Sequence, residues 1–238
     1  MSSFYRKDAM EAEAKIDLDK EFAKVFGSSI EQINPNEAKE PIDKDRIVQL
    51  TGLPEHKISN VYMYGSRVYG TYNDNSDYDF LVLANSLEEK REVRDCLYNV
   101  HIVVPNIFYD DLNTYKMQNL ECVFAPNFAK IQETQVYSLN IDIQKLKKKA
   151  LAQSYDSWHK GKYKLNEGDI YRGKKSIFHS IRILCFARQI VRHGKIKDFS
   201  EANKYWYQID ECEKTRWNYY SRKYFVLRRS LIESLTEE

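Results

Sequence analysis

The chain has few cysteines and no long apolar segment. Its four cysteines lie far apart (Cys96, Cys122, Cys185 and Cys212), without the paired spacing of zinc sites and redox couples. We therefore expect a reducing, cytoplasmic environment in which they are small core residues. No apolar run approaches the roughly 18 to 20 residues that a membrane helix needs, and the first residues lack the apolar centre of a secretory signal. A membrane partner is therefore not expected.

The chain also has no internal repeat and no low-complexity run. Apolar residues make up 42% of the sequence and charged residues 30%, which indicates a soluble globular protein rather than a disordered or fibrous one. A length of 238 residues suits one large domain or two small ones, and allows a core that needs no disulfides.

The formal net charge of +2 conceals an asymmetry along the chain. Residues 1–144 contain 15 Lys/Arg and 24 Asp/Glu, a net of −9, whereas residues 145–238 contain 22 and 11, a net of +11. Residues 145–195 alone carry 14 basic and 3 acidic side chains, so they account for the whole excess. Such a segment is either a solvated helical surface or a surface that binds a polyanion.

Apolar periodicity divides the chain into three predicted parts. Residues 1–42 form an N-terminal helix (4–26) and a linker (28–42), residues 43–139 a small catalytic core, and residues 140–238 a basic helical domain. Predicted core elements are a helix that Asp43 or Asp45 caps and that ends at 50, strands at 58–64, 79–84 and 99–104, and helices at 87–97 and 108–120, with 120–124 left open. Later predicted helices are 140–153, 170–193, 199–208 and 216–235. The predicted fold is α/β (α+β), a mixed-sheet core followed by helices.

Residues 62–82, YMYGSRVYGTYNDNSDYDFLV, join two predicted strands through a polar loop. Asp77 and Asp79 stand two residues apart at the head of the second strand, so both carboxylates point to the same face. Convergent carboxylates bind hard divalent cations, with Mg²⁺ the usual choice when phosphates complete its shell. Two such ions, ~3.5–4 Å apart, would hold the attacking and leaving oxygens of an in-line phosphoryl displacement.

Gly65 and Ser66 lie at the end of the first of these strands. They supply an anion-binding part of the site that complements the two carboxylates. A glycine lets the backbone approach a ligand closely, and successive N–H groups at the start of the following helix, with the Ser66 hydroxyl, bind anions. Arg67 would add a charge-assisted contact to a phosphate. Each motif alone is common in turns and caps, and their joint order in one strand–loop–strand segment is the specific signal.

The run GSRVYGTYNDNSDYDFLVL resembles the signature of the polymerase-β-like nucleotidyltransferase superfamily, glycine-serine followed by aspartate-x-aspartate. GSR-x-x-G and SDYD are similar to the minimal bacterial and viral members, which include predicted RNA-repair nucleotidyltransferases. LECVFAP at 120–126 and KKSIFHSIRIL at 174–184 are similar to the same subgroup. The resemblance covers roughly residues 60–131 and, more loosely, 168–195.

This resemblance implies an enzyme that transfers a nucleoside monophosphate from a nucleoside triphosphate, such as ATP, to an acceptor hydroxyl with release of pyrophosphate. It also implies Mg²⁺, or alternatively Mn²⁺, as the cofactor. By the same resemblance, Gly65 and Ser66 would hold the triphosphate, Asp77 and Asp79 would bind the metal, and Arg67 would touch a phosphate.

One departure concerns the third carboxylate that the family usually supplies from a neighbouring strand. The matching position in NVHIVV is Asn99, or failing that His101. Asparagine keeps a carbonyl ligand but loses the negative charge and cannot act as a general base. Asn99 is either natural, in a weakened or altered enzyme, or a replacement of aspartate made to trap substrates. Glu121 is a distant substitute.

Lys175, His179 and Arg182 share one face of the predicted helix 170–193, since they are spaced i, i+4 and i+7. A neighbouring stripe should pack inward, namely Ile177, Ile181 and Leu184. The polar face is either solvated or part of the nucleotide cleft, and we expect it to bind the nucleotide.

The acceptor is indicated by the segment 155–182, which interleaves aromatic and basic residues, among them Tyr155, Trp158, Tyr163 and Tyr171. Base stacking and phosphate contacts use such surfaces; alternatively, Trp158 and Tyr163 are core residues. We predict an RNA 3′ end as acceptor, in repair or tailing. The alternatives are a protein or small-molecule acceptor, or a nucleotide-binding protein with weakened catalysis. The base preference and the oligomeric state do not follow from the sequence.

Overall fold

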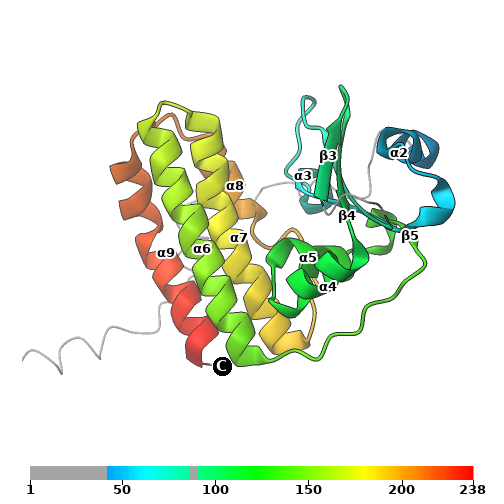
Figure 1. Ribbon diagram of the computed structural model, residues 1–238. Coiled ribbons are helices and arrows are strands. Elements are labelled where there is room, and N and C mark those ends of the chain that lie inside the picture. The colour runs from blue at the N-terminus through cyan, green and yellow to red at the C-terminus, as the bar shows by residue number, and fades with distance from the viewer. Residues whose placement is uncertain (1–41, 86–89, 238) are drawn as a thin grey trace, which may run out of the picture. The chain divides into compact units, whose positions relative to one another are not determined.

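The computed structural model describes residues 42–85 and 90–237. In this part of the chain, a mixed five-stranded sheet with short helices precedes a group of long helices (Figure 1). The predicted α/β fold class with a helical C-terminal part is confirmed. The helix predicted over 4–26 and nearly all of the linker predicted over 28–42 lie outside the described residues.

The first group of elements is α2 (Lys44–Thr51), η1 (Glu55–Lys57), β1 (Ile58–Tyr64), α3 (Ser66–Tyr69), β2 (Tyr78–Ala84), β3 (Lys90–Arg94), β4 (Tyr98–Val103), α4 (Pro105–Asn113), α5 (Met117–Val123), η2 (Asn127–Ala129) and β5 (Lys130–Glu133). The second group is α6 (Ile143–Asn166), α7 (Ile170–His193), α8 (Asn203–Asp210) and α9 (Trp217–Glu237).

The strand register brings three strand ends together. The order in the sheet is β3-β4-β2-β1-β5, with β2 and β4 parallel and the other neighbours antiparallel. Tyr64, the last residue of β1, pairs with Asp79, and Asp79 pairs in turn with Asn99 near the start of β4. The end of β1 and the beginnings of β2 and β4 therefore meet at one end of the sheet.

The three predicted strands are confirmed to within one residue at each end. Their apolar residues are buried because helices and neighbouring strands cover them, as for Val61, Phe80, Val82 and Val100, none of which has any exposed surface. Such nearly continuous apolar runs are typical of strands that protein covers on both faces.

The helix predicted over 87–97 is wrong, because residues 90–94 form strand β3, which pairs with β4 at the edge of the sheet. The sequence KREVR contains residues that favour helices in isolation, but strand pairing overrides this local preference. Its charged side chains are typical of edge strands, where they discourage pairing with another chain.

The other edge strand, β5, was not predicted, because KIQE is too short and too polar to show an apolar run. The single helix predicted over 108–120 is two helices, α4 and α5. They are separated by a turn in which Tyr115 adopts a φ of 57°. Of residues 120–124, for which no structure was predicted, those as far as Val123 belong to α5.

The long helices α6, α7 and α9 run alongside one another (Figure 1). Helix α7 has its predicted bounds, whereas α6 continues 13 residues beyond the predicted end at 153. The predicted apolar stripe on α7 is confirmed, since Ile177, Ile181 and Leu184 have no exposed surface. None of the helices in the described part of the chain combines the length and apolar character needed to cross a membrane.

Two glycines allow α6 and α7 to lie close together. A Cβ at Gly161 would come within 2.8 Å of Ile177 Cγ1, and a Cβ at Gly173 within 2.7 Å of Leu165 Cγ. Backbone atoms of the facing helix lie only 3.1–3.2 Å from the same two positions. The spacing of these helices, and with it the position of the polar face of α7, depends on the absence of side chains here.

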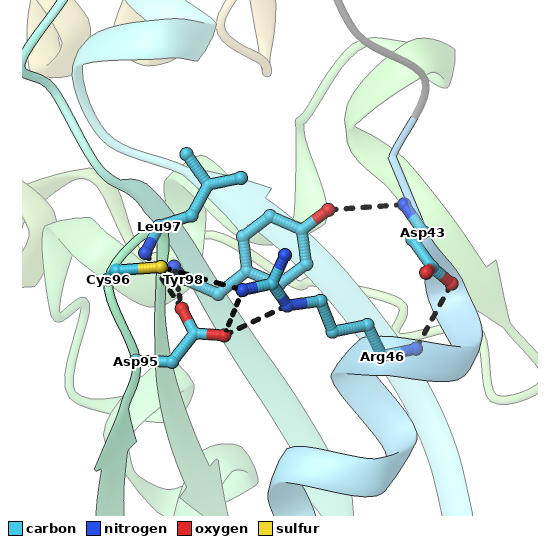
Figure 2. A network of polar contacts seen from close by, with 6 residues as sticks. All are labelled: Asp43, Arg46, Asp95, Cys96, Leu97 and Tyr98. Atoms are coloured by element: carbon cyan, nitrogen blue, oxygen red, sulfur yellow. Dashed lines mark hydrogen bonds and ion pairs between the residues drawn. The ribbon is translucent and has the colours of Figure 1, made fainter.

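Helix α2 is fixed to the turn between β3 and β4 by a polar network (Figure 2). Arg46 donates two hydrogen bonds to Asp95 Oδ2, at 2.9 and 2.6 Å, and Asp95 Oδ1 accepts from the backbone N–H groups of Leu97 and Tyr98. These bonds, led by the one from Tyr98, hold the pKa of Asp95 below its usual range. The network fixes the start of β4, next to Asn99.

The prediction that all four cysteines are core residues holds for Cys122 and Cys185, which are buried. It is wrong for Cys96, which is exposed in the β3–β4 turn and accepts a long contact of 3.7 Å from Arg46. Cys212 is partly exposed. All four are free thiols.

We predict that Gly161→Leu lowers the free energy of unfolding by about 1–3 kcal/mol, because the added side chain forces α6 and α7 apart. Lys162→Leu is the matched control, since it places the same side chain one residue later at an exposed position. Thermal unfolding of both variants tests the prediction. Equal melting temperatures would show that the helices do not depend on close approach at Gly161.

Candidate active site

The turn between β1 and α3 requires glycine at its first position. Gly65 has a φ of 85°, a region that residues with a Cβ rarely adopt. A Cβ at this position would also lie 2.5 Å from Asp79 Oδ2. The backbone at the end of β1 therefore passes directly against the Asp79 carboxylate, and no larger residue would permit this approach.

A single cavity of about 560 Å³ brings most of the predicted nucleotide-binding residues together. Gly65, Ser66 and Asp79 line it from the sheet side, and Lys175, His179 and Arg182 line it from α7. The remaining lining residues are Tyr69, Thr71, Ser157, Lys160, Tyr171, Arg172, Ser176, Phe178 and Trp206. We call this space the site cavity. Residues about 100 positions apart in the sequence thus face one another across it.

Asp79 lies in a partly desolvated position, and Asp77 lies in a more open one. Burial is the main reason why the pKa of Asp79 is raised; the nearby Asp77 adds to the rise, and a hydrogen bond from Asn99 opposes it. Asp77 is half exposed, with its Oδ2 3.3 Å from Arg94 Nη2. The two carboxylates repel one another, which is the electrostatic condition that a bound cation would relieve.

Asn99 occupies the position next to Asp79. Its Nδ2 donates a hydrogen bond of 3.0 Å to Asp79 Oδ1 and lies 3.1 Å from His101 Nε2. Its carbonyl oxygen Oδ1 is buried and has no hydrogen-bond partner. An unpartnered oxygen on the residue that contacts the Asp79 carboxylate suits a hard cation such as Mg²⁺. With an amide at this position, the described residues contain no group of three His, Cys, Asp or Glu side chains that could hold a metal.

Arg67 points away from the site cavity. Its Nη2 donates a 2.6 Å hydrogen bond to the Ser76 carbonyl. Its guanidinium lies 3.7 Å from the ring centroid of Tyr78 and 5.0 Å from that of Tyr72. In this arrangement, Arg67 holds the loop between α3 and β2 in place, and that loop carries Asp77.

Tyr69 belongs to a buried polar cluster that the sequence did not indicate. Its hydroxyl donates a hydrogen bond to the Glu121 carboxylate, and the Arg182 guanidinium lies 3.7 Å from its ring centroid. Burial raises the pKa of Glu121, while the charge of Arg182 and the Tyr69 bond oppose that rise. Glu121, considered above as a substitute third carboxylate, is thus engaged by Tyr69 on α3 and by Arg182.

His179 is held as a neutral donor by its neighbour. Arg182 Nη2 lies 2.7 Å from His179 Nδ1, and because arginine can only donate, Nδ1 must accept. The ring proton is then on Nε2. Burial, followed by the charge of Arg182, holds the pKa of His179 well below its ordinary value. His179 therefore offers the site cavity an uncharged N–H donor.

Several residues that line the site cavity were not predicted from the sequence, because no local pattern marks them. Trp206 lies on α8 and Thr71 follows α3, and only the packing of distant elements brings them to the cavity. Lys160 and Tyr171 belong to the segment of mixed aromatic and basic residues, which was the one available signal. Within that segment, Trp158 is a core residue that packs against Trp217, with ring centroids 4.9 Å apart.

Comparison with known proteins identifies a family model that matches part of the chain. Residues 49–119 match the family model described as nucleotidyltransferase domain, and this segment contains both the glycine-serine and the aspartate-x-aspartate motifs. A nucleotidyltransferase-like protein from Exiguobacterium sibiricum 255-15 superposes with a TM-score of 0.31 and 11% identity, over 80% of this chain and 73% of that chain. Comparison with the curated proteins finds no match.

The matched segment is a nucleotidyltransferase domain, and its presence supports nucleotidyl transfer as the general activity of this chain. The donor of such a reaction is a nucleoside triphosphate. The resemblance stated from the two motifs is thereby confirmed.

We predict that Gly65→Ala lowers the rate of nucleotidyl transfer by about 10²-fold, because the new Cβ displaces the Asp79 carboxylate and misplacement of about 1 Å costs this much. Gly52→Ala is the control: Gly52 has a similar φ of 64°, but nothing lies within 4 Å of its Cβ position. Pyrophosphate release by the two variants measures the effect. Equal losses in both would attribute it to backbone strain rather than to contact with Asp79.

Proposed function

We propose that this chain is a Mg²⁺-dependent nucleotidyltransferase that transfers a nucleoside monophosphate from a nucleoside triphosphate to the 3′ hydroxyl of RNA. One observation carries the proposal: the site cavity unites Gly65, Ser66 and Asp79 with the basic face of α7. Phosphoryl transfer from a nucleotide requires a phosphate-binding turn, an acidic position that binds a metal, and cationic hydrogen-bond donors that contact the phosphates.

The charge of the site cavity suits a triphosphate. Its lining contains one carboxylate, that of Asp79, and four cationic side chains, those of Lys160, Arg172, Lys175 and Arg182. Charge-assisted hydrogen bonds from such groups to phosphate oxygens are about twice as strong as neutral ones. Among the aromatic lining residues, Tyr171 is 46% exposed, so its ring offers a surface on which a nucleobase can stack.

A divalent cation would be held by the carboxylates of Asp77 and Asp79 and by the free carbonyl oxygen of Asn99. When bound, it would polarise a phosphoryl oxygen and neutralise developing charge. The chain's own groups would then orient the donor: Arg182 and Lys175 would contact its phosphates, and the Gly65–Ser66 turn would approach them closely. Mn²⁺ has the same ligand preferences and is the alternative ion.

RNA is the acceptor that the charge distribution favours. Residues 145–195 carry 14 basic and 3 acidic side chains, and α6 and α7, which lie in this segment, border the site cavity. A cationic small molecule would be repelled by the same side chains, and a protein acceptor does not require them. A role in RNA repair or tailing would follow.

Labelled nucleoside triphosphates, offered one at a time with Mg²⁺ and either total RNA or whole-cell protein, are expected to label RNA 3′ ends, and Asp79→Asn should abolish the labelling. The variant keeps the shape of the side chain but loses the charge that would bind the metal. Circular dichroism checks that it remains folded. Labelling of protein instead of RNA would show that the acceptor is a protein. Undiminished labelling by Asp79→Asn would refute the proposed site.

We predict that Asn99→Asp raises the rate by about 10²-fold or more, because it supplies both a third charged ligand and a group able to accept the proton of the attacking hydroxyl. Steady-state pyrophosphate release at saturating Mg²⁺ measures this. No gain in the variant, together with tight nucleotide binding by the unaltered chain, would favour a nucleotide-binding protein over an enzyme.

A further inference from the structure

Helix α6 exposes a row of aromatic rings to solvent. Tyr155, His159 and Tyr163 are spaced i, i+4 and i+8, so they lie one above another on one face. The ring centroids of Tyr155 and His159 are 4.2 Å apart, and the tyrosines have 59% and 60% of their surface exposed. Trp158, three residues after Tyr155 on the same helix, is only 8% exposed and packs against Trp217. The row is therefore separate from the core that Trp158 joins.

The charges around this row are mainly positive, although the Glu167 carboxylate accepts a hydrogen bond from Tyr163. Helix α6 carries seven lysines and a single acidic residue, Asp156. Lys148, Lys149, Lys160 and Lys162 are exposed. Exposed rings surrounded by cations have the chemistry that binds a single-stranded nucleic acid, whose bases stack on rings and whose phosphates contact lysine. A neutral or basic protein surface would gain nothing from these lysines.

The aromatic row is continuous with the site cavity. Lys160 and Ser157, on the adjoining face of α6, line that cavity together with Asp79. Lys160 follows His159 directly, so it lies between the row and the cavity. The row and the site cavity are therefore adjacent on α6.

We propose that the row formed by Tyr155, His159 and Tyr163 is the platform on which the unpaired 3′ segment of the acceptor RNA stacks before its end enters the site cavity. From Tyr155 to Tyr163 the helix rises about 12 Å, which accommodates about three stacked nucleotides at roughly 3.4 Å each. The acceptor must be single-stranded here, because paired bases in a duplex do not present their faces to side chains. This inference rests on the proposed function.

The test is the affinity of the full chain for a labelled, single-stranded RNA of 12 nucleotides, measured by fluorescence anisotropy. The double variant Tyr155→Ala/Tyr163→Ala is expected to bind at least tenfold more weakly, since loss of each stacking ring weakens binding by about fivefold or more. Tyr155→Phe/Tyr163→Phe should restore binding, because it retains both rings. Phe225→Ala is the control and should leave the affinity unchanged. Phe225 lies on α9 and is also 60% exposed.

Two further measurements separate this inference from the proposed function. Binding of a nucleoside triphosphate with Mg²⁺ should be the same in the double alanine variant as in the unaltered chain, because neither ring lines the site cavity. A blunt RNA duplex of equal length should bind less tightly than the single strand and should be insensitive to the variant.

Unchanged affinity of the double alanine variant for single-stranded RNA would overturn the platform, whether or not RNA is labelled. Equal loss of affinity for duplex and single strand would also overturn it, because that result indicates a purely electrostatic surface. If the chain labels RNA through Asp79 and yet the rings prove irrelevant, the platform fails while the proposed function stands. If no RNA binds at all, the platform and the RNA acceptor both fail.

Discussion

The arrangement of the site depends on one buried residue, Tyr69. Its hydroxyl bonds Glu121 on α5, its ring lies beneath Arg182 of α7, and its carbonyl accepts a 2.6 Å hydrogen bond from Asn203 Nδ2 on α8. The following residue, Gly70, accepts from the Tyr207 hydroxyl on α8 at 3.3 Å. Because Tyr69 ends the same short helix that Ser66 begins, these contacts fix the Gly65–Ser66 turn relative to the helices across the cavity.

This arrangement places charged groups where water cannot fully solvate them. Burial raises the pKa of Glu121 and of Asp79, which means that their ionised forms are destabilised in the folded chain. Each has a compensating partner: Arg182 for Glu121, and the amide of Asn99 for Asp79. Glu121 and Asn99 each keep one buried oxygen without a hydrogen bond. Unsatisfied groups of this kind are expected at sites that bind ligands, where stability is exchanged for reactivity.

Prediction from the sequence succeeded where one local pattern sufficed. β1 and β2 are long apolar runs bounded by polar loops, and α7 has an aspartate cap at one end and Gly194 at the other. It failed for β3, whose residues KREVR form a strand only because β4 offers a hydrogen-bonding edge. It also failed for β5, which is mostly polar (KIQE) and pairs with β1. Edge strands depend on a partner rather than on their own composition.

The sequence by itself determined the two motifs, the strands that carry them and the basic face of α7, because each depends on residues within about twenty positions of one another. Only the tertiary structure decided that Arg67 points to Ser76, that Glu121 bonds Tyr69, and that Trp158 is buried while Tyr163 is exposed. It also decided which residues share the site cavity. The physical reason is that the orientation of a long side chain is set by the charges and rings it meets across the fold, and these belong to elements far away in the sequence.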